Sequence, residues 1–135
     1  MSAIERGDIV CMMGDRCREK DGLLIDFLGE PARFPFAAFY LSAKCACPIV
    51  PMFVFRKHRH DNLLFHFGKP VYPEPECHVQ SRHRRESLRP YVAAYVAELE
   101  TASRRFPFQC YIFEDVWAET PSDINSGVFP EGQIT

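Results

Sequence analysis

The hydrophobic positions of the chain fall into several short, continuous runs. Residues 8–13, 23–28, 49–55 and 63–67 are rich in Ile, Val, Leu, Met and Phe, and Gly, Pro or charged residues separate them. Short apolar runs with such boundaries are typical of β-strands that are buried on at least one face. We therefore predict strands in these four segments, with 49–55 and 63–67 paired as a hairpin, and a last strand at residues 111–113.

Two longer stretches place their apolar residues three and four positions apart, which is the spacing of one helix face. The first covers residues 36–45, with Phe36, Phe39, Tyr40 and Ala43 on one side. The second runs from Ser87, which can cap a helix, to Arg105, with Pro90 expected in its first turn. Its apolar stripe consists of Leu88, Tyr91, Val92, Tyr95, Val96, Leu99 and Ala102. Residues 2–7 predict a short helix that Gly7 ends.

The order of these elements is strand, strand, helix, strand, strand, helix, strand. Residues 29–35 hold one Gly and two Pro and therefore predict a loop between the second strand and the first long helix. This order favours an α/β domain in which a mixed β-sheet is covered by amphipathic helices. We assign residues 1–117 to this domain and predict that residues 118–135, rich in Pro, Gly, Ser and Asn, form a disordered tail.

Residues 36–55 are nearly all apolar and are long enough to cross a bilayer. Lys44, Pro48 and Pro51 interrupt them, and a residue before proline disfavours helix. This segment therefore predicts a helix followed by a buried strand, and not a membrane span.

Composition and charge exclude few classes of function. The 135 residues are 47% hydrophobic and 25% charged, with a formal net charge of -2, so nothing in the overall charge indicates a nucleic-acid partner. The charge is uneven, however, because residues 56–60 and 82–85 are basic while residues after 113 contain no Lys or Arg. The basic clusters fit either solvated loops or contacts with anionic lipids and phosphates.

Six cysteines occur, and they are expected to be reduced because the first residues lack the pattern of a signal peptide. Cys45 and Cys47 have one residue between them, whereas zinc knuckles usually have at least two. A metal-binding module using Cys45, Cys47, Cys77 and His78 stays open as a weaker alternative. The sequence predicts no metal and no cofactor.

Candidate chemistry lies at the ends of two apolar runs. Gly14-Asp15-Arg16 follows the first run, and Arg33 comes just before the helix expected at residue 36. Arginine binds phosphate oxygens through two donors at once, and a helix N-terminus also favours anions. We therefore predict a phosphate site near these strand ends, with Asp15 orienting Arg16. Its expected members are Asp15, Arg16, Gly29, Arg33, Phe34 and Pro35. In the simpler alternative, Asp15 and Arg16 are turn residues and Arg33 is a surface charge.

Other catalytic patterns are missing from the sequence. It contains no G-x-x-x-x-G-K-[ST] and no G-x-S-x-G motif. Most of its five histidines lie in charged segments, where a solvated role is expected, and His66 is expected on the wetter face of its strand. We therefore predict no catalytic residue in this chain.

Taken together, three segments carry a family resemblance. "GDIVCMMGDR", "IDFLGEPARFPFAAFYLSAKCACPIVPMFVFR" and "RRFPFQCYIFEDVW" occur in this order, with a hairpin, a proline-rich link and an amphipathic helix before the third. The succession resembles the bacterial lipid A biosynthesis lauroyl/myristoyl acyltransferases of the lysophospholipid acyltransferase superfamily, over residues 4–117. In the third segment Pro107, Gln109 and Tyr111 match the P-x-Q-aromatic pattern that closes the family's domain.

The resemblance implies a fold and an activity. It implies the C-terminal part of the glycerol-phosphate acyltransferase fold, and transfer of a fatty acyl group from a carrier thioester to a hydroxyl of a phosphorylated glycolipid such as a lipid A precursor. In such proteins the segment like Gly14-Asp15-Arg16 supplies an arginine for the acceptor's phosphate. The resemblance also implies a cytoplasmic protein held peripherally on the anionic inner face of the cell membrane.

Two departures limit what the resemblance implies. The superfamily's F-P-E-G type motif appears here as Phe34-Pro35-Phe36-Ala37, which is nearer the lipid A branch. The catalytic pattern, a histidine followed five positions later by Asp or Glu, is absent. The residues five positions after His58, His60, His66, His78 and His83 are Leu63, Phe65, Val71, His83 and Leu88.

In the family the catalytic motif precedes the strand that resembles residues 8–13. We therefore expect this chain to correspond to a C-terminal half that is inactive alone, because the histidine is the general base for the acceptor hydroxyl. Its partners would be the half that carries the base, or a second copy that pairs through an exposed sheet edge. The alternative is a non-catalytic phosphate-binding, lipid-binding or scaffold domain.

Overall fold

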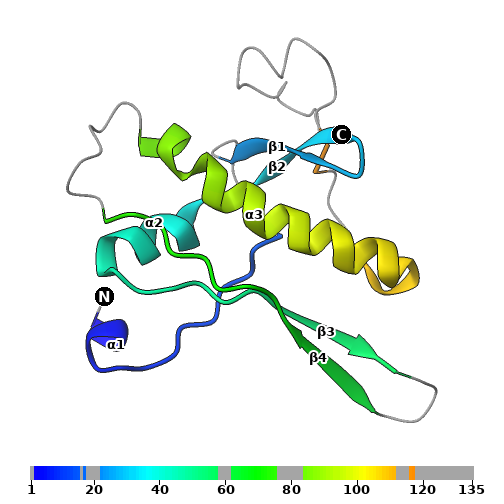
Figure 1. Ribbon diagram of the computed structural model, residues 1–135, viewed down its shortest axis with the longest axis horizontal. Helices are drawn as coiled ribbons and strands as arrows, with labels where there is room; N and C mark the ends of the chain where they lie inside the picture. Colours follow the sequence, from blue (N-terminus) through cyan, green and yellow to red (C-terminus); the bar gives the residue numbers. More distant parts are fainter. Residues whose placement is uncertain are drawn as a thin grey trace, which may run out of the picture.

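The structure is a computed structural model, and it describes residues 2–15, 17, 22–57, 62–75, 84–111 and 116–117. The elements along the chain are α1 (Ser2–Glu5), β1 (Leu23–Phe27), β2 (Glu30–Phe34), α2 (Ala37–Cys45), β3 (Met52–Arg56), β4 (Leu63–Phe67), α3 (Arg84–Arg105) and the 3-10 helix η2 (Pro107–Gln109). The long helix α3 lies across the middle of the molecule, with one hairpin toward each side of it (Figure 1). The predicted α/β class is confirmed.

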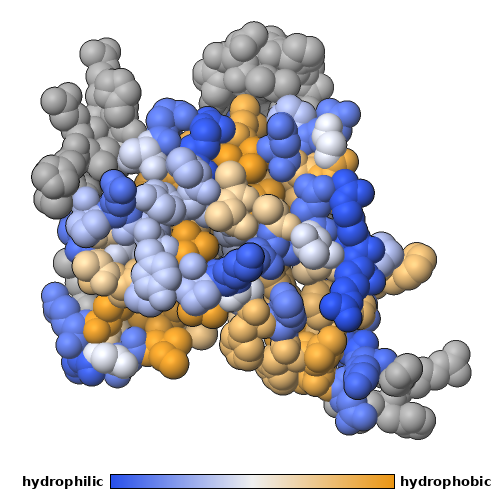
Figure 2. Space-filling model, viewed as in Figure 1, coloured by the Kyte–Doolittle hydropathy of each residue, from blue (hydrophilic) through white to orange (hydrophobic). Residues whose placement is uncertain are grey.

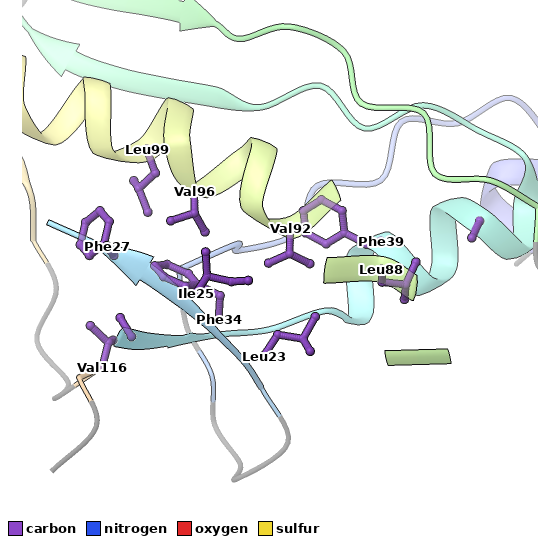
Figure 3. Close-up of a cluster of buried hydrophobic side chains, with 12 residues drawn as sticks. Leu23, Ile25, Phe27, Phe34, Phe39, Leu88, Val92, Val96, Leu99 and Val116 are labelled. Carbon is purple, nitrogen blue, oxygen red and sulfur yellow. The ribbon is translucent and has the colours of Figure 1, made fainter. Parts of the chain in front are cut away.

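The first hairpin carries the core. β1 and β2 pair antiparallel so that Leu23 faces Phe34, Ile25 faces Ala32 and Phe27 faces Glu30. Because side chains alternate along a strand, Leu23, Ile25 and Phe27 share one face, and all are buried. α3 packs on this face, so the apolar residues of both elements meet in one cluster (Figure 3).

A two-residue turn, Leu28 and Gly29, joins β1 to β2. Both residues have positive φ, 56° and 99°. Positive φ at both central positions is what a type I′ hairpin turn requires, and glycine adopts it without a Cβ penalty. Glu100 of α3 accepts a hydrogen bond from the Leu28 N–H at 3.2 Å, which ties the turn to the helix.

The predicted apolar stripe of α3 is confirmed. Its buried side chains are Leu88, Val92, Val96, Leu99 and Ala102. The helix begins at Arg84, so the expected start at Ser87 is wrong and Pro90 lies beyond the first turn. Near this end Arg89 donates to the Leu24 carbonyl at 2.6 Å, which fastens α3 to β1.

The second hairpin, β3 and β4, is antiparallel as predicted. One of its faces meets aromatic side chains: Phe53 stacks on Tyr95 of α3 at 6.2 Å between ring centroids, and Phe55 on Phe106 at 4.1 Å. Its other face, described below, is exposed. Before β3, an isolated bridge joins Ile49 to Val71, so the pairing continues beyond the strands.

Several expectations are corrected by the structure. The strands form two separate antiparallel pairs within the described residues, not the single mixed sheet that the element order favoured. Residues 8–13 form no strand, and all six residues are exposed. Residues 29–35, expected as a loop, contain the turn glycine and β2.

The helix expected at residues 36–45 is confirmed as α2, followed by a separate strand. In the part of the chain that the structure describes, no helix has the length and apolar character needed to cross a bilayer. Tyr111 lies outside any strand, and the remainder of the expected last strand falls on residues that the structure does not describe. The predicted tail, 118–135, also lies outside the described residues.

Candidate functional site

Arg33 is a buried cation, not the surface charge of the simpler alternative. It pairs with Leu24 across the first hairpin, on the face opposite the apolar core, and is 5% exposed. Its guanidinium Nη1 donates to the carbonyl of Gly22 at 3.4 Å. Its backbone N–H donates to the Val116 carbonyl at 2.7 Å, which holds this position of β2 from the other edge. The side chain is therefore held in a defined place at the open end of the hairpin.

Gly22 brings a second segment of the chain against Arg33. A Cβ atom built at Gly22 would lie 2.5 Å from Arg33 Cγ, 2.7 Å from Cys17 Sγ and 2.8 Å from the carbonyl oxygen of Phe34. Only a residue without a side chain fits between these groups. Cys17 and Arg33 therefore both lie against Gly22, close to each other.

Asp15 lies at the start of that same segment. Gly14 touches α3 so closely that a Cβ there would be 2.6 Å from Tyr95 Oη. Burial raises the pKa of Tyr95, and the negative charge of Asp15 raises it further. One carboxylate oxygen of Asp15, Oδ1, is buried and forms no hydrogen bond among the described residues. A hydrogen-bond donor from another residue or from a ligand would stabilise this buried carboxylate oxygen.

The positions of Asp15 and Arg33 are linked through Cys17. Two peptide units separate Asp15 from Cys17, so their Cα atoms are at most about 7.6 Å apart. The structure thus brings the segment carrying Asp15 to the end of the hairpin where Arg33 is held. Arg16 lies outside the described residues, so its convergence with Arg33 stays a prediction.

Two of the other predicted site residues, Phe34 and Gly29, do not lie beside the Arg33 guanidinium. Phe34 is 1% exposed and belongs to the apolar core, and its side chain points to the face opposite that of Arg33. Gly29 lies at the turn end of the hairpin, far along β2 from Arg33, and the type I′ turn explains it without a ligand.

Pro35 is half-buried and directly precedes the N-cap of α2, Phe36, which makes no side-chain cap hydrogen bond. The guanidinium of Arg85 lies 5.3 Å from the centroid of the Phe36 ring, a cation–π arrangement. Arg85, at the start of α3, is thus a second arginine close to the first turn of α2. The sequence gave no indication of this contact.

Gln109 has a structural role that the sequence did not reveal. Its side-chain Oε1 accepts from the Arg56 N–H at 2.7 Å, and its Nε2 donates to the Arg56 carbonyl at 3.1 Å. The amide therefore makes, at the end of β3, the two hydrogen bonds that a neighbouring strand would make. The P-x-Q pattern singled out this residue, but only the fold shows which backbone it meets.

The metal-binding alternative gains no support from the described residues. Among them, no group of three or more His, Cys, Asp or Glu gathers closely enough to hold an ion. Cys45 and Cys47 are half-buried free thiols, while Cys77 and His78 lie outside the described residues.

Comparison with known protein families gives a match. The sequence profile described as bacterial lipid A biosynthesis acyltransferase matches residues 1–98, which include Asp15, Arg33 and most of α3. No curated protein and no solved structure matches the chain.

Proposed function

The chain belongs to the bacterial lipid A biosynthesis acyltransferase family, and from this premise we propose that it forms the acceptor-binding part of an acyltransferase. In the complete reaction a fatty acyl group moves from a carrier thioester to a hydroxyl of a phosphorylated glycolipid. Arg16 and Arg33 are the residues to which we assign the acceptor's phosphate, and Asp15 is the residue that would orient Arg16. Of these residues, Arg33 lies at the open end of the β1–β2 hairpin.

The held, buried guanidinium of Arg33 is the observation that supports this proposal. A cation in a partly dry position attracts an anion more strongly than one in water, because the effective dielectric constant is lower. The neighbouring segment carries Arg16 by sequence, and two guanidinium groups would bind a phosphate through several charge-assisted hydrogen bonds. Asp15 would then orient Arg16, using the carboxylate oxygen that has no partner among the described residues.

Acyl transfer also needs a group that removes the proton of the acceptor hydroxyl. The hydroxyl oxygen attacks the thioester carbonyl, the C–S bond breaks, and the thiol leaves with a proton. None of the five histidines in these 135 residues is followed five positions later by an acid. We therefore propose that this chain binds the acceptor but transfers no acyl group unless another polypeptide segment supplies the base.

A non-catalytic phosphate-binding or scaffold domain is the second candidate, and the missing histidine–acid pair is the observation that favours it. The two candidates differ in one measurement. Acyl transfer that appears when a segment with the histidine–acid pair is added supports the enzyme. No transfer under that condition, together with intact phosphate binding, supports the binding domain.

Calorimetry with inorganic phosphate and with a soluble phosphorylated glucosamine tests the site itself. Removing one charge-assisted contact costs roughly 1.5–3 kcal/mol, so Arg16→Ala should weaken binding about 10-fold or more. Arg33→Lys should lose part of the affinity, since lysine keeps the charge but not the fork.

Arg104→Ala is the matched control, because Arg104 is exposed and pairs only with Glu100 among the described ion pairs. Its affinity should equal that of the wild type. Unchanged affinity in Arg16→Ala and Arg33→Lys, with circular dichroism showing a native fold, would refute the phosphate site.

We also propose that the chain works in the cytoplasm, peripherally on the inner face of the cell membrane. The acceptor is a lipid, so its phosphate lies at a membrane surface. The basic clusters in the sequence would be attracted to an anionic leaflet.

A further inference from the structure

The β3–β4 hairpin exposes an apolar face that the proposed acceptor site does not use. The register places Met52 opposite Phe67 and Val54 opposite Phe65, so these four side chains share one side of the hairpin, with Leu63. These five residues, here called the outer face, are between 43% and 61% exposed. Figure 2 shows apolar side chains gathered over β3 and β4. Two of the five are phenylalanines, which a hairpin in water would usually bury.

Basic residues lie at both ends of this hairpin along the chain. Arg56 shares its side at the free end of the hairpin, opposite Leu63, and Lys57 and Lys69 are exposed nearby in the chain. Residues 49–70 contain four Lys or Arg, namely Arg56, Lys57, Arg59 and Lys69, and one acid, Asp61. The whole chain, in contrast, has a net charge of -2. The segment that carries the outer face is thus cationic in sequence, whereas the chain as a whole has a slightly negative net charge.

We propose that the outer face of the β3–β4 hairpin inserts into the headgroup–acyl boundary of an anionic bilayer. Its phenylalanine and aliphatic side chains would enter the boundary, while Arg56 and Lys57 extend to the lipid phosphates. The inference rests on the proposed membrane association and deepens it, because it assigns that association to a specific surface. The charge complementarity between this hairpin and an anionic leaflet selects the bilayer as its partner.

Two observations make a protein partner a weaker fit for this face. Lysine is depleted from protein interfaces, whereas this hairpin is flanked by two exposed lysines. Strand addition along β3 is also restricted, because the Gln109 amide already binds both backbone groups of Arg56. A bilayer needs only the side-chain face and makes no use of the strand edge.

Vesicle flotation with the full chain tests the proposal. The protein should float with vesicles of phosphatidylethanolamine and phosphatidylglycerol, less in high salt, and much less with pure phosphatidylcholine. Replacing both phenylalanines, as Phe65→Ser with Phe67→Ser, should lower the partition coefficient about tenfold or more, because each ring buries substantial apolar area. Lys57→Gln should lower it several-fold, at about 1 kcal/mol per cation near the surface.

Leu28→Ser is the matched control, since Leu28 is an exposed apolar residue of the other hairpin, 40% exposed. It should float like the wild type. Equal flotation of the double phenylalanine variant would overturn the proposal, and so would equal binding to neutral vesicles. A wild-type dimer that the double variant dissociates, with no vesicle binding, would overturn it in favour of a second copy on this face.

Phosphate calorimetry on the same samples separates this inference from the proposed function. A wild-type protein that binds phosphate but does not bind anionic vesicles would refute the membrane-facing surface alone. Vesicle binding by a wild type that does not bind phosphate would support the surface and refute the acceptor site.

Discussion

The strands of the two hairpins have the same length, but the first hairpin is largely buried and the second is largely exposed. The β1–β2 hairpin buries one whole face against α3, and its second strand is bridged at Ala32 to Trp117. The β3–β4 hairpin buries only Phe55 among its ten strand residues and leaves five large apolar side chains exposed. The two hairpins differ in burial because α3 has one apolar stripe, and the first hairpin covers most of it. The first hairpin contributes most of the buried core and holds a buried cation, while the second leaves an apolar face exposed.

The largest difference between the hairpins should appear when one phenylalanine is truncated in each. Phe27→Ala removes a side chain with 0% exposure and should cost about 3–5 kcal/mol of unfolding free energy. Phe65→Ala, half-exposed on β4, should cost within about 1 kcal/mol. Urea denaturation followed by circular dichroism measures both. Equal losses would show that the second hairpin is as well packed as the first.

Gln109→Ala should loosen the second hairpin at its free end. Two hydrogen bonds to Arg56 are lost, which should cost about 1 kcal/mol because the site is exposed to competing water. Amide exchange at Arg56 should accelerate in the variant. Lys57 is the internal control, since its N–H bonds to the Asn62 carbonyl within the hairpin at 2.9 Å. Unchanged exchange at Arg56 would contradict the role assigned to Gln109.

Leu28→Asn should tighten the first hairpin. Leu28 holds a φ of 56°, where asparagine is tolerated better than leucine, so the variant should gain about 0.5 kcal/mol or slightly more. The thermal midpoint should rise by a few degrees. A lower midpoint would show that the exposed leucine side chain contributes packing that outweighs the backbone strain.

Glu100, which holds the same turn, should give a smaller and pH-dependent effect. Hydrogen bonds from Arg104 and from the Leu28 N–H hold its pKa below the usual range. A lowered folded-state pKa stabilises the protein above the ordinary glutamate value of about 4.3, and the gain disappears as pH falls through the lower folded value. Glu100→Gln should therefore melt below the wild type at neutral pH, and the two should converge in acid. A gap that persists in acid would exclude this charge effect.

Local patterns were enough to predict the elements with strong periodicity. The stripe from Leu88 to Ala102 and the helix at residues 37–45 follow from spacings of three and four, and both packed as expected. The β3–β4 hairpin followed from two aromatic-rich runs. For the two helices the intrinsic preference of the segment also agrees with its tertiary surroundings.

β2 was missed because its sequence, EPARF, contains a proline that usually marks a loop. The pairing explains why it is tolerated. The Arg33 N–H bonds to Val116 on the side away from β1, so the nitrogen of Pro31, two residues earlier, also points away from β1. No bond with β1 is lost. The sequence alone does not show on which side of β2 the strand β1 pairs, so it could not show that Pro31 is tolerated there.

The apolar run at residues 8–13 shows the opposite error, since its composition is that of a strand but no paired strand meets it in the described structure.

The candidate site was partly predictable. Asp15 and Arg33 were predicted as site residues because they lie at the end of an apolar run and just before a helix. The role of Gly22 depends on the close approach of three groups and has no signal in the sequence. Gly29 was selected for the wrong reason, because a turn requires it.

The bridge from Ala32 to Trp117 has a practical consequence for experiments. Trp117 is the single tryptophan of the chain; it stacks on Phe27 at 6.2 Å between ring centroids, and its indole Nε1 donates to the Phe27 carbonyl at 3.4 Å. Its intrinsic fluorescence therefore reports on one half of the molecule. Its emission should change when residues 116–117 detach from β2. It should not change when only the β3–β4 hairpin is perturbed, so Trp117 fluorescence reports on one region of the molecule.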